Sequence, residues 1–246
     1  MPDATRRTLF GTAAAATLAT AAQGAAPETT TMRPIPPLDP ANRFATAGAA
    51  PAQTLPVHTS RALTVQALTP EAFAPFGQVL TAEGRRRLPI NTYGDRLDLF
   101  REGFESDQPT EWFIFLGRDR GAGVLFLERH QQLTQTFIPV GGKGFHTVVA
   151  RPGAREEGGL PALDELAAFW VPGDAAIQLH RATWHENPMP VEDGTRMLVT
   201  SHANLTLAHQ ADPDPRLRAL PLDLERRWYR HAGYDLSVTR FGSPMP

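Results

Sequence analysis

The sequence predicts an all-β protein with a few short helices, folded as an antiparallel barrel or sandwich. Short runs of β-branched and aromatic residues recur at close spacing, and Gly, Pro or Asp flanks each run. Only one segment within this series, Leu163–Phe169, has the pattern of a helix. The expected strands are Trp112–Leu116, Val124–Leu127, Gln135–Val140, Phe145–Ala150, Ala175–Leu179 and Met197–Ser201. Strands spaced so closely favour antiparallel pairing over a fold that alternates strands with helices.

The composition is that of a globular protein, with 41% hydrophobic and 20% charged residues in a chain of 246. Basic residues number 24 against 26 acidic ones, and no basic stripe is interleaved with aromatics, so we expect no nucleic-acid partner. Cysteine is absent, which excludes disulfides, thiolate metal sites and a cysteine nucleophile. Any metal must therefore be held by nitrogen and oxygen ligands.

The first 26 residues have the pattern of an export signal. Arg6 and Arg7 precede an uncharged run, Thr8–Pro27, which ends in small residues. The segment resembles a twin-arginine signal peptide. Because the run is rich in Ala, Thr and Gly, it suits a spanning helix poorly, and we expect no stable membrane anchor. This predicts a periplasmic protein.

Residues 27–60 are rich in proline and alanine and are expected to form an extended linker before a folded domain over residues 61–246. Leu63–Val65 is expected to be a short strand. Thr69 then offers a helix N-cap ahead of a short helix that ends at Phe73. Near the end of the chain, Asp223 is expected to cap a helix through Tyr229, followed by an irregular tail.

Polar residues interrupt one of the expected strands. Glu128 and His130 are two residues apart and share a face of the strand, while Arg129 points to the opposite face. If the strand lines a small barrel, both reach its interior, where Gln135 on the next strand could face them. Two further imidazoles, His180 and His185, follow the strand expected at 175–179. Oxygen and imidazole donors of this kind suit a hard or borderline divalent ion.

The spacing of these residues resembles the two cupin motifs. The first motif has two histidines one residue apart, then an acid and a glycine, and the residues at those positions here are Glu128, His130, Gln135 and Gly142. The second motif, Pro-x-Gly-x-x-His, is matched in spacing by His180, Ala182 and His185. An acid replaces the first histidine, and glutamine replaces the usual acid. The resemblance implies a cupin-type double-stranded β-helix, or jelly-roll barrel.

Four segments further resemble the ureidoglycolate lyase (ureidoglycolate hydrolase) family, over about Leu63–Ser201. They read LTPEAFAPFGQVL from Leu68, PINTYGDRLDLF from Pro89, ERHQQLTQTFIPV from Glu128 and LHRATWHENP from Leu179. This resemblance implies a homodimer, a divalent metal such as nickel or manganese, and cleavage of ureidoglycolate to glyoxylate and urea.

The resemblance also implies roles for individual residues. The implied metal ligands are Glu128, His130, Gln135 and His185. His180 is expected to donate a proton to the leaving urea, and Glu128 could act as a base instead of a ligand. Asn91 and Arg96 match the family's carboxylate-binding segment, and Arg181 either binds substrate or anchors an acid of a neighbouring strand.

The chain also departs from the family pattern. Ser201-His202 stands where the family strand ends in Asp-Arg, so a charge pair that handles substrate is missing there, and the tail from Asp212 has no counterpart. Two other functions stay open at this point. One is a periplasmic, metal-dependent cupin oxygenase or isomerase for another small hydroxy acid. The other is a non-catalytic cupin that binds a small ligand.

Overall fold

The computed structural model describes residues 56–90, 94–203 and 223–239. The chain divides into two compact units, Met1–Met32 and Arg33–Pro246, and every described residue belongs to the second. The expected signal, residues 1–26, and all but the end of the expected linker lie outside the described residues. Within the described part, no helix combines the length and the apolar character needed to cross a membrane.

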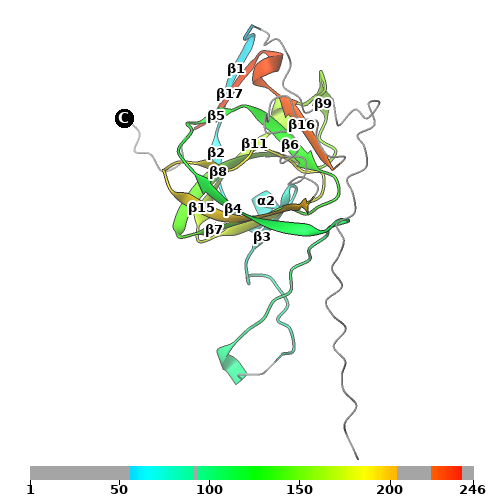
Figure 1. Ribbon diagram of the computed structural model, residues 1–246, viewed down its shortest axis with the longest axis vertical. Helices are drawn as coiled ribbons and strands as arrows, with labels where there is room; N and C mark the ends of the chain where they lie inside the picture. Colours follow the sequence, from blue (N-terminus) through cyan, green and yellow to red (C-terminus); the bar gives the residue numbers. More distant parts are fainter. Residues whose placement is uncertain (1–55, 91–93, 204–222, 240–246) are drawn as a thin grey trace, which may run out of the picture. The chain divides into compact units, whose positions relative to one another are not determined.

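Short strands make up most of the described chain, as predicted (Figure 1). The first half contains β1 (Thr59–Leu63), β2 (Val65–Ala67), α2 (Pro70–Phe73), β3 (Gly77–Leu80), the 3-10 turn η1 (Gly94–Arg96), β4 (Thr110–Gly117), β5 (Gly123–Val124), β6 (Phe126–His130), β7 (Thr136–Val140) and β8 (Gly142–Ala150). The second half contains β9 (Glu156–Glu157), β10 (Leu160–Pro161), η2 (Leu163–Glu165), β11 (Ala167–Gly173), β12 (Ala176–Leu179), β13 (Trp184–His185), β14 (Met189–Pro190), β15 (Thr195–His202), β16 (Leu224–Trp228), η3 (Arg230–Ala232) and β17 (Tyr234–Val238).

Two large sheets carry the fold (Figure 1). One has seven strands in the order β16-β6-β13-β8-β11-β2, with β14 also paired to β8. The other has five strands in the order β3-β12-β7-β15-β4. Most neighbours pair antiparallel and many are far apart in sequence, which is the pairing of a jelly-roll. The predicted all-β, cupin-type fold is confirmed.

The main core lies between the two sheets. Phe145 and Phe169 from the seven-stranded sheet pack in one buried cluster with Phe137, Ile177 and Met197 from the five-stranded sheet. Burial of each such side chain stabilises the folded protein by about 1.5 to 3 kcal/mol. The sheets therefore enclose an apolar interior, and a polar side chain that points into it needs a partner.

A second core covers the outer face of the seven-stranded sheet. Leu127, Val148 and Trp184 point away from the main core and pack with Leu236 and Val238 of β17. β17 pairs with β1 and β5 in a three-stranded sheet. The seven-stranded sheet is thus covered on both faces. Side chains on β6 therefore point alternately toward the main core and toward this second core.

The two expected helices at Leu163–Phe169 and Asp223–Tyr229 are corrected by the structure. The first is a 3-10 turn, Leu163–Glu165, followed by strand β11, whose Phe169 is buried in the main core. The second is strand β16, which pairs antiparallel with β6. In both segments, pairing with a distant strand outweighs a local helix signal. By contrast, Thr69 caps α2 as expected, since its hydroxyl accepts a hydrogen bond from the Ala72 amide.

Candidate metal centre and active site

Three side chains lie abreast on the inner face of the seven-stranded sheet. Glu128 of β6 is paired directly with His185 of β13 on one side and with Arg226 of β16 on the other. His130 lies two residues after Glu128 on the same strand and therefore points to the same face. Arg129, between them, points to the opposite face, where its guanidinium lies 4.2 Å from the centre of the Trp184 ring. The alternation predicted from the sequence is confirmed.

Glu128, His130 and His185 converge closely enough to hold one metal ion. One ligand atom from each lies within 4.8 Å of the others. All three residues are buried, with exposed fractions of 4%, 3% and 1%. All three are among the metal ligands predicted from the sequence, and the structure brings them together.

The second nitrogen of each ring is already held. His130 donates from Nδ1 to Asp223 Oδ2 at 2.7 Å, and His185 donates from Nδ1 to the Thr183 carbonyl at 3.1 Å. This fixes the ring orientations and leaves both Nε2 atoms buried without a hydrogen-bond partner. Because an unpaired buried nitrogen is costly, two such atoms that converge beside a carboxylate fit a divalent cation.

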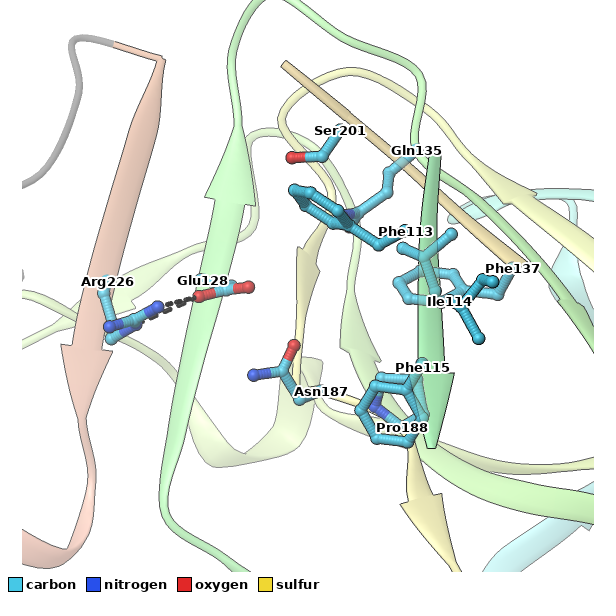
Figure 2. A pocket seen from close by; sticks show the side chains of 11 residues that line it. Phe113, Ile114, Phe115, Glu128, Gln135, Phe137, Asn187, Pro188, Ser201 and Arg226 are labelled. Carbon is cyan, nitrogen blue, oxygen red and sulfur yellow. Dashed lines mark hydrogen bonds and ion pairs between the residues drawn. The ribbon is translucent and has the colours of Figure 1, made fainter. Parts of the chain in front are cut away.

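Gln135 approaches from the opposite sheet. It immediately precedes β7, is 6% exposed, and its Oε1 atom is buried without a hydrogen-bond partner. Gln135 and Glu128 both line a cavity of about 240 Å³ (Figure 2). The fourth predicted ligand therefore shares the cavity, and its free carbonyl oxygen is a suitable donor for a hard cation.

The cavity has apolar walls and a few polar groups. Phe113, Phe115 and Phe137 form much of the wall, and Asn187 and Ser201 add polar side chains. Figure 2 shows these groups around the Glu128 carboxylate. A small site with apolar walls and few polar groups is typical of a small-molecule pocket.

Arg226 determines the charge state of Glu128. Its Nη2 and Nε atoms donate to Glu128 Oε2 at 2.6 and 3.0 Å. Burial alone would raise the pKa of Glu128, but the charge of Arg226, with smaller contributions from His185 and His130, outweighs it and lowers the pKa below its ordinary value. Glu128 is therefore an anion at neutral pH, and Oε1 is the oxygen that Arg226 leaves free.

The two imidazoles differ in their affinity for a proton. Burial lowers the pKa of His185 to about 4, so this ring is neutral and ready to bind a metal. Burial also lowers the pKa of His130, but the hydrogen bond and charge of Asp223 outweigh it and raise the pKa above its ordinary value. A proton therefore competes with a metal at His130, and acid should release the ion.

The low pKa of His185 predicts a pH-dependent stability in chelator-treated protein. Between about pH 6.5 and pH 5 the unfolded chain binds a proton at this residue and the folded chain does not, so the free energy of unfolding decreases as the pH is lowered. We expect the stability advantage of wild type over His185→Gln to shrink by about 1.5 kcal/mol across this window. Urea unfolding at several pH values measures it, and a constant difference would contradict the assignment.

Three other predicted site residues, His180, Arg181 and Arg96, are not among the residues that line this cavity. His180 is exposed and donates from Nε2 to the Ala74 carbonyl at 3.2 Å. Arg181 binds Asp107 with two hydrogen bonds, so it does anchor a neighbouring acid. Arg96 lies exposed in η1, and Asn91 lies outside the described residues. The roles of His180, Arg96, Arg181 and Asn91 as proton donor or substrate ligands stay predictions.

Two residues of the site were missed by the sequence analysis. Asp223 and Arg226 lie in the C-terminal segment, where a helix was expected. Their contact partners, His130 and Glu128, are more than ninety residues earlier in the chain. The local sequence gives no strand signal here, since Leu224 and Trp228 are the only apolar residues of LERRW and charged residues fill the three positions between them.

The backbone at Ala182 supports the position assigned to the second motif. Ala182 has a φ angle of 63°, in the left-handed region that favours glycine, and the cupin motif has glycine at this position. Its amide donates to the His130 carbonyl at 2.6 Å. The turn that leads to His185 is therefore attached directly to the strand that carries Glu128 and His130.

Comparison with known proteins identifies the family. The ureidoglycolate lyase family profile matches residues 60–211. The ureidoglycolate lyase of Brucella melitensis biotype 2 is 36% identical over 146 residues, which cover 57% of this chain and 83% of that protein. The ureidoglycolate lyases of Brucella anthropi, 31% identical over 57% of this chain and 83% of that protein, and of Pseudomonas fluorescens, 33% identical over 58% and 86%, are also similar. With its all-β fold and its buried Glu-His-His cluster, the chain belongs to the ureidoglycolate lyase family.

Proposed function

We propose that this protein is a lyase that cleaves ureidoglycolate to glyoxylate and urea at a divalent metal held by Glu128, His130, Gln135 and His185. The observation that carries the proposal is the convergence of unpaired donor atoms. His130 Nε2, His185 Nε2 and Gln135 Oε1 are all buried without partners, beside a carboxylate, in a chain of this family. A bound ion would supply Lewis acidity that lowers the pKa of the substrate hydroxyl.

Glu128 is suited to carry the proton in this reaction as the alternative to binding the metal, because Arg226 leaves it one free oxygen, which can serve only one of the two roles. The hydroxyl proton must leave oxygen and the urea nitrogen must gain one when the carbon–nitrogen bond breaks. Both atoms are bonded to the same carbon, so one carboxylate can accept the first proton and deliver it to the nitrogen. Among the described residues that line the cavity, Glu128 is the only carboxylate, and Arg226 holds only one of its oxygens.

We further propose nickel or manganese as the metal and the periplasm as the location. The donors are two imidazoles, a carboxylate and a carboxamide, and a chain without cysteine offers no thiolate to favour a softer ion. The twin-arginine pattern of the first 26 residues supports export.

The decisive experiment offers racemic ureidoglycolate to the metal-loaded protein and measures glyoxylate and urea. We expect the two products in equal amounts, with loss of activity after chelation and recovery when one metal is added back. Oxygen consumption without urea release would instead identify an oxygenase, and tight binding without turnover would identify a binding protein. Either result would contradict the proposal.

The family resemblance also implies a homodimer, and the outer face of β4 supports it. Trp112, Ile114 and Leu116 are 57%, 81% and 62% exposed, on an edge strand. Two apolar residues on the neighbouring strands extend this patch. Leu198 of β15 is paired with Ile114, and Ile138 of β7 is paired with Leu198. We name this set the β4 face. An exposed apolar patch on an edge strand is typical of a subunit interface, so we propose that a second copy covers it.

A charge in the β4 face should break the dimer. We expect Ile114→Glu to convert the protein to a monomer in sedimentation measurements, because a carboxylate buried between two apolar faces is costly. Val57→Glu is the matched control, since Val57 is 43% exposed but lies before β1, away from β4. A wild-type protein that sediments as a monomer, or an Ile114→Glu variant that remains a dimer, would contradict this interface.

A further inference from the structure

We infer that Arg226, delivered by the C-terminal strand β16, binds the carboxylate of the substrate, and that β16 therefore completes the active site. The ligand class is a small 2-hydroxy carboxylate. The inference deepens the proposed lyase function and rests on it for the identity of the natural substrate.

Arg226 lies in the wall of the catalytic cavity. It is 7% exposed and lines the cavity together with Glu128 and Gln135 (Figure 2). Its two hydrogen bonds to Glu128 run from Nε and Nη2 and end on one oxygen, Oε2. The guanidinium also lies over the Phe126 ring, 4.5 Å from its centre, but Nη1 forms no hydrogen bond with the described residues and stays available as a donor for another anion.

Arg226 is also the only cationic side chain among the described residues that line this cavity. The other arginines considered for substrate lie elsewhere, since Arg181 is held by Asp107 and Arg96 is exposed in η1. Arg226 and Glu128 alone have no net charge, whereas a divalent ion makes the group strongly positive. An anionic substrate then meets a fixed guanidinium beside the metal, with the fork geometry that suits a carboxylate.

The strand that carries Arg226 lies beyond the part of the chain that defines the family. The profile match ends at residue 211, and β16 begins at Leu224. Within the matched part, Ser201 and His202 replace the Asp-Arg pair expected there. His202 Nδ1 lies 3.5 Å from Asp223 Oδ2, and Ser201 lines the same cavity as Arg226, so the β16 segment brings an acid next to His202 and an arginine into the cavity of Ser201.

Several contacts fix β16 in this position. Asp223 accepts from His130 Nδ1 at 2.7 Å and from the Gln132 amide at 2.6 Å. On the outer face, Arg129 donates to Glu225 Oε2 at 2.9 and 2.6 Å. The strand is therefore held on both faces, and the direction of Arg226 is set by the sheet.

The test measures binding of glycolate, a 2-hydroxy carboxylate that cannot release urea, to the metal-loaded full chain by calorimetry. Glycolamide, which lacks the negative charge, is the matched ligand. We expect Arg226→Gln to weaken glycolate binding by about tenfold or more and to leave glycolamide binding unchanged. Arg230→Gln is the control variant, because Arg230 follows β16 but forms only a surface pair with Asp235. It should bind both ligands like wild type, and metal content should be equal in all proteins.

Arg226→Lys keeps a positive charge beside Glu128 and decides the matter if Arg226→Gln does not fold. A guanidinium can bind Glu128 through one edge and a second carboxylate through another, whereas the lysine ammonium has no such edges. Glycolate binding by Arg226→Lys should therefore still fall about fivefold. Wild-type glycolate affinity in a folded Arg226 variant, an equal loss for both ligands, or no glycolate binding by wild type would overturn the inference. A protein that binds glycolate through Arg226 but does not cleave ureidoglycolate would refute the lyase function and leave this inference standing.

Discussion

Replacing His130 with alanine should abolish metal binding and lower turnover of ureidoglycolate by about a thousandfold or more. His130 offers Nε2 to the site, and Asp223 fixes the ring through its other nitrogen, so alanine removes an oriented ligand. Metal analysis of the purified variant and glyoxylate release measure the two effects. Because acid protonates this ring, wild-type metal occupancy should also fall as pH is lowered.

His58→Ala is the matched control for this variant. His58 is an exposed imidazole whose Nε2 donates to the Ala232 carbonyl at 3.1 Å, in the three-stranded region away from the cavity. It should retain full metal content and full activity. A His130→Ala protein that is folded, metal-loaded and active would show that the proposed site is wrong.

Glu128→Gln should damage both stability and catalysis. The substitution leaves Arg226 buried without its counter-ion, and breaking a buried ion pair from one side costs about 3 kcal/mol. Loss of a carboxylate that either binds the metal or carries the proton should lower kcat by about a hundredfold or more. Denaturant unfolding and steady-state kinetics measure the two effects separately.

The double variant Glu128→Gln, Arg226→Met separates these effects. Methionine removes the unpaired charge and suits an apolar surrounding, so we expect most of the lost stability to return. Activity should stay low, because the carboxylate is still missing. Recovery of activity together with stability would mean that Glu128 has only a structural role.

The sequence predicts the inner part of the site because local rules govern it. Alternation along β6 places Glu128 and His130 on one face, whatever the strand pairs with. The turn before His185 could be placed by its spacing, and the left-handed backbone at Ala182 agrees with that assignment. Composition further restricted the ligands to nitrogen and oxygen donors.

The outer part of the site depends on pairing across the sheet, which local rules do not reveal. Asp223 suggests a helix cap. In the structure, however, the segment forms strand β16 along the edge of β6, and one basic and one acidic side chain of β6 form ion pairs with it. These contacts join residues more than ninety positions apart, and their energies exceed a weak helix preference. The same reasoning explains Phe169. As part of a strand its ring is buried in the main core, and this burial outweighs the local helix signal.

X-ray absorption at the metal edge tests the central claim most directly, since the claim is that two imidazoles and oxygen donors converge on one ion. For the protein as purified, we predict one divalent ion per chain, with two imidazole nitrogens and oxygen ligands around it and no sulfur. A protein that binds no metal, or holds one without imidazole ligands, while cleaving ureidoglycolate at full rate would contradict the account.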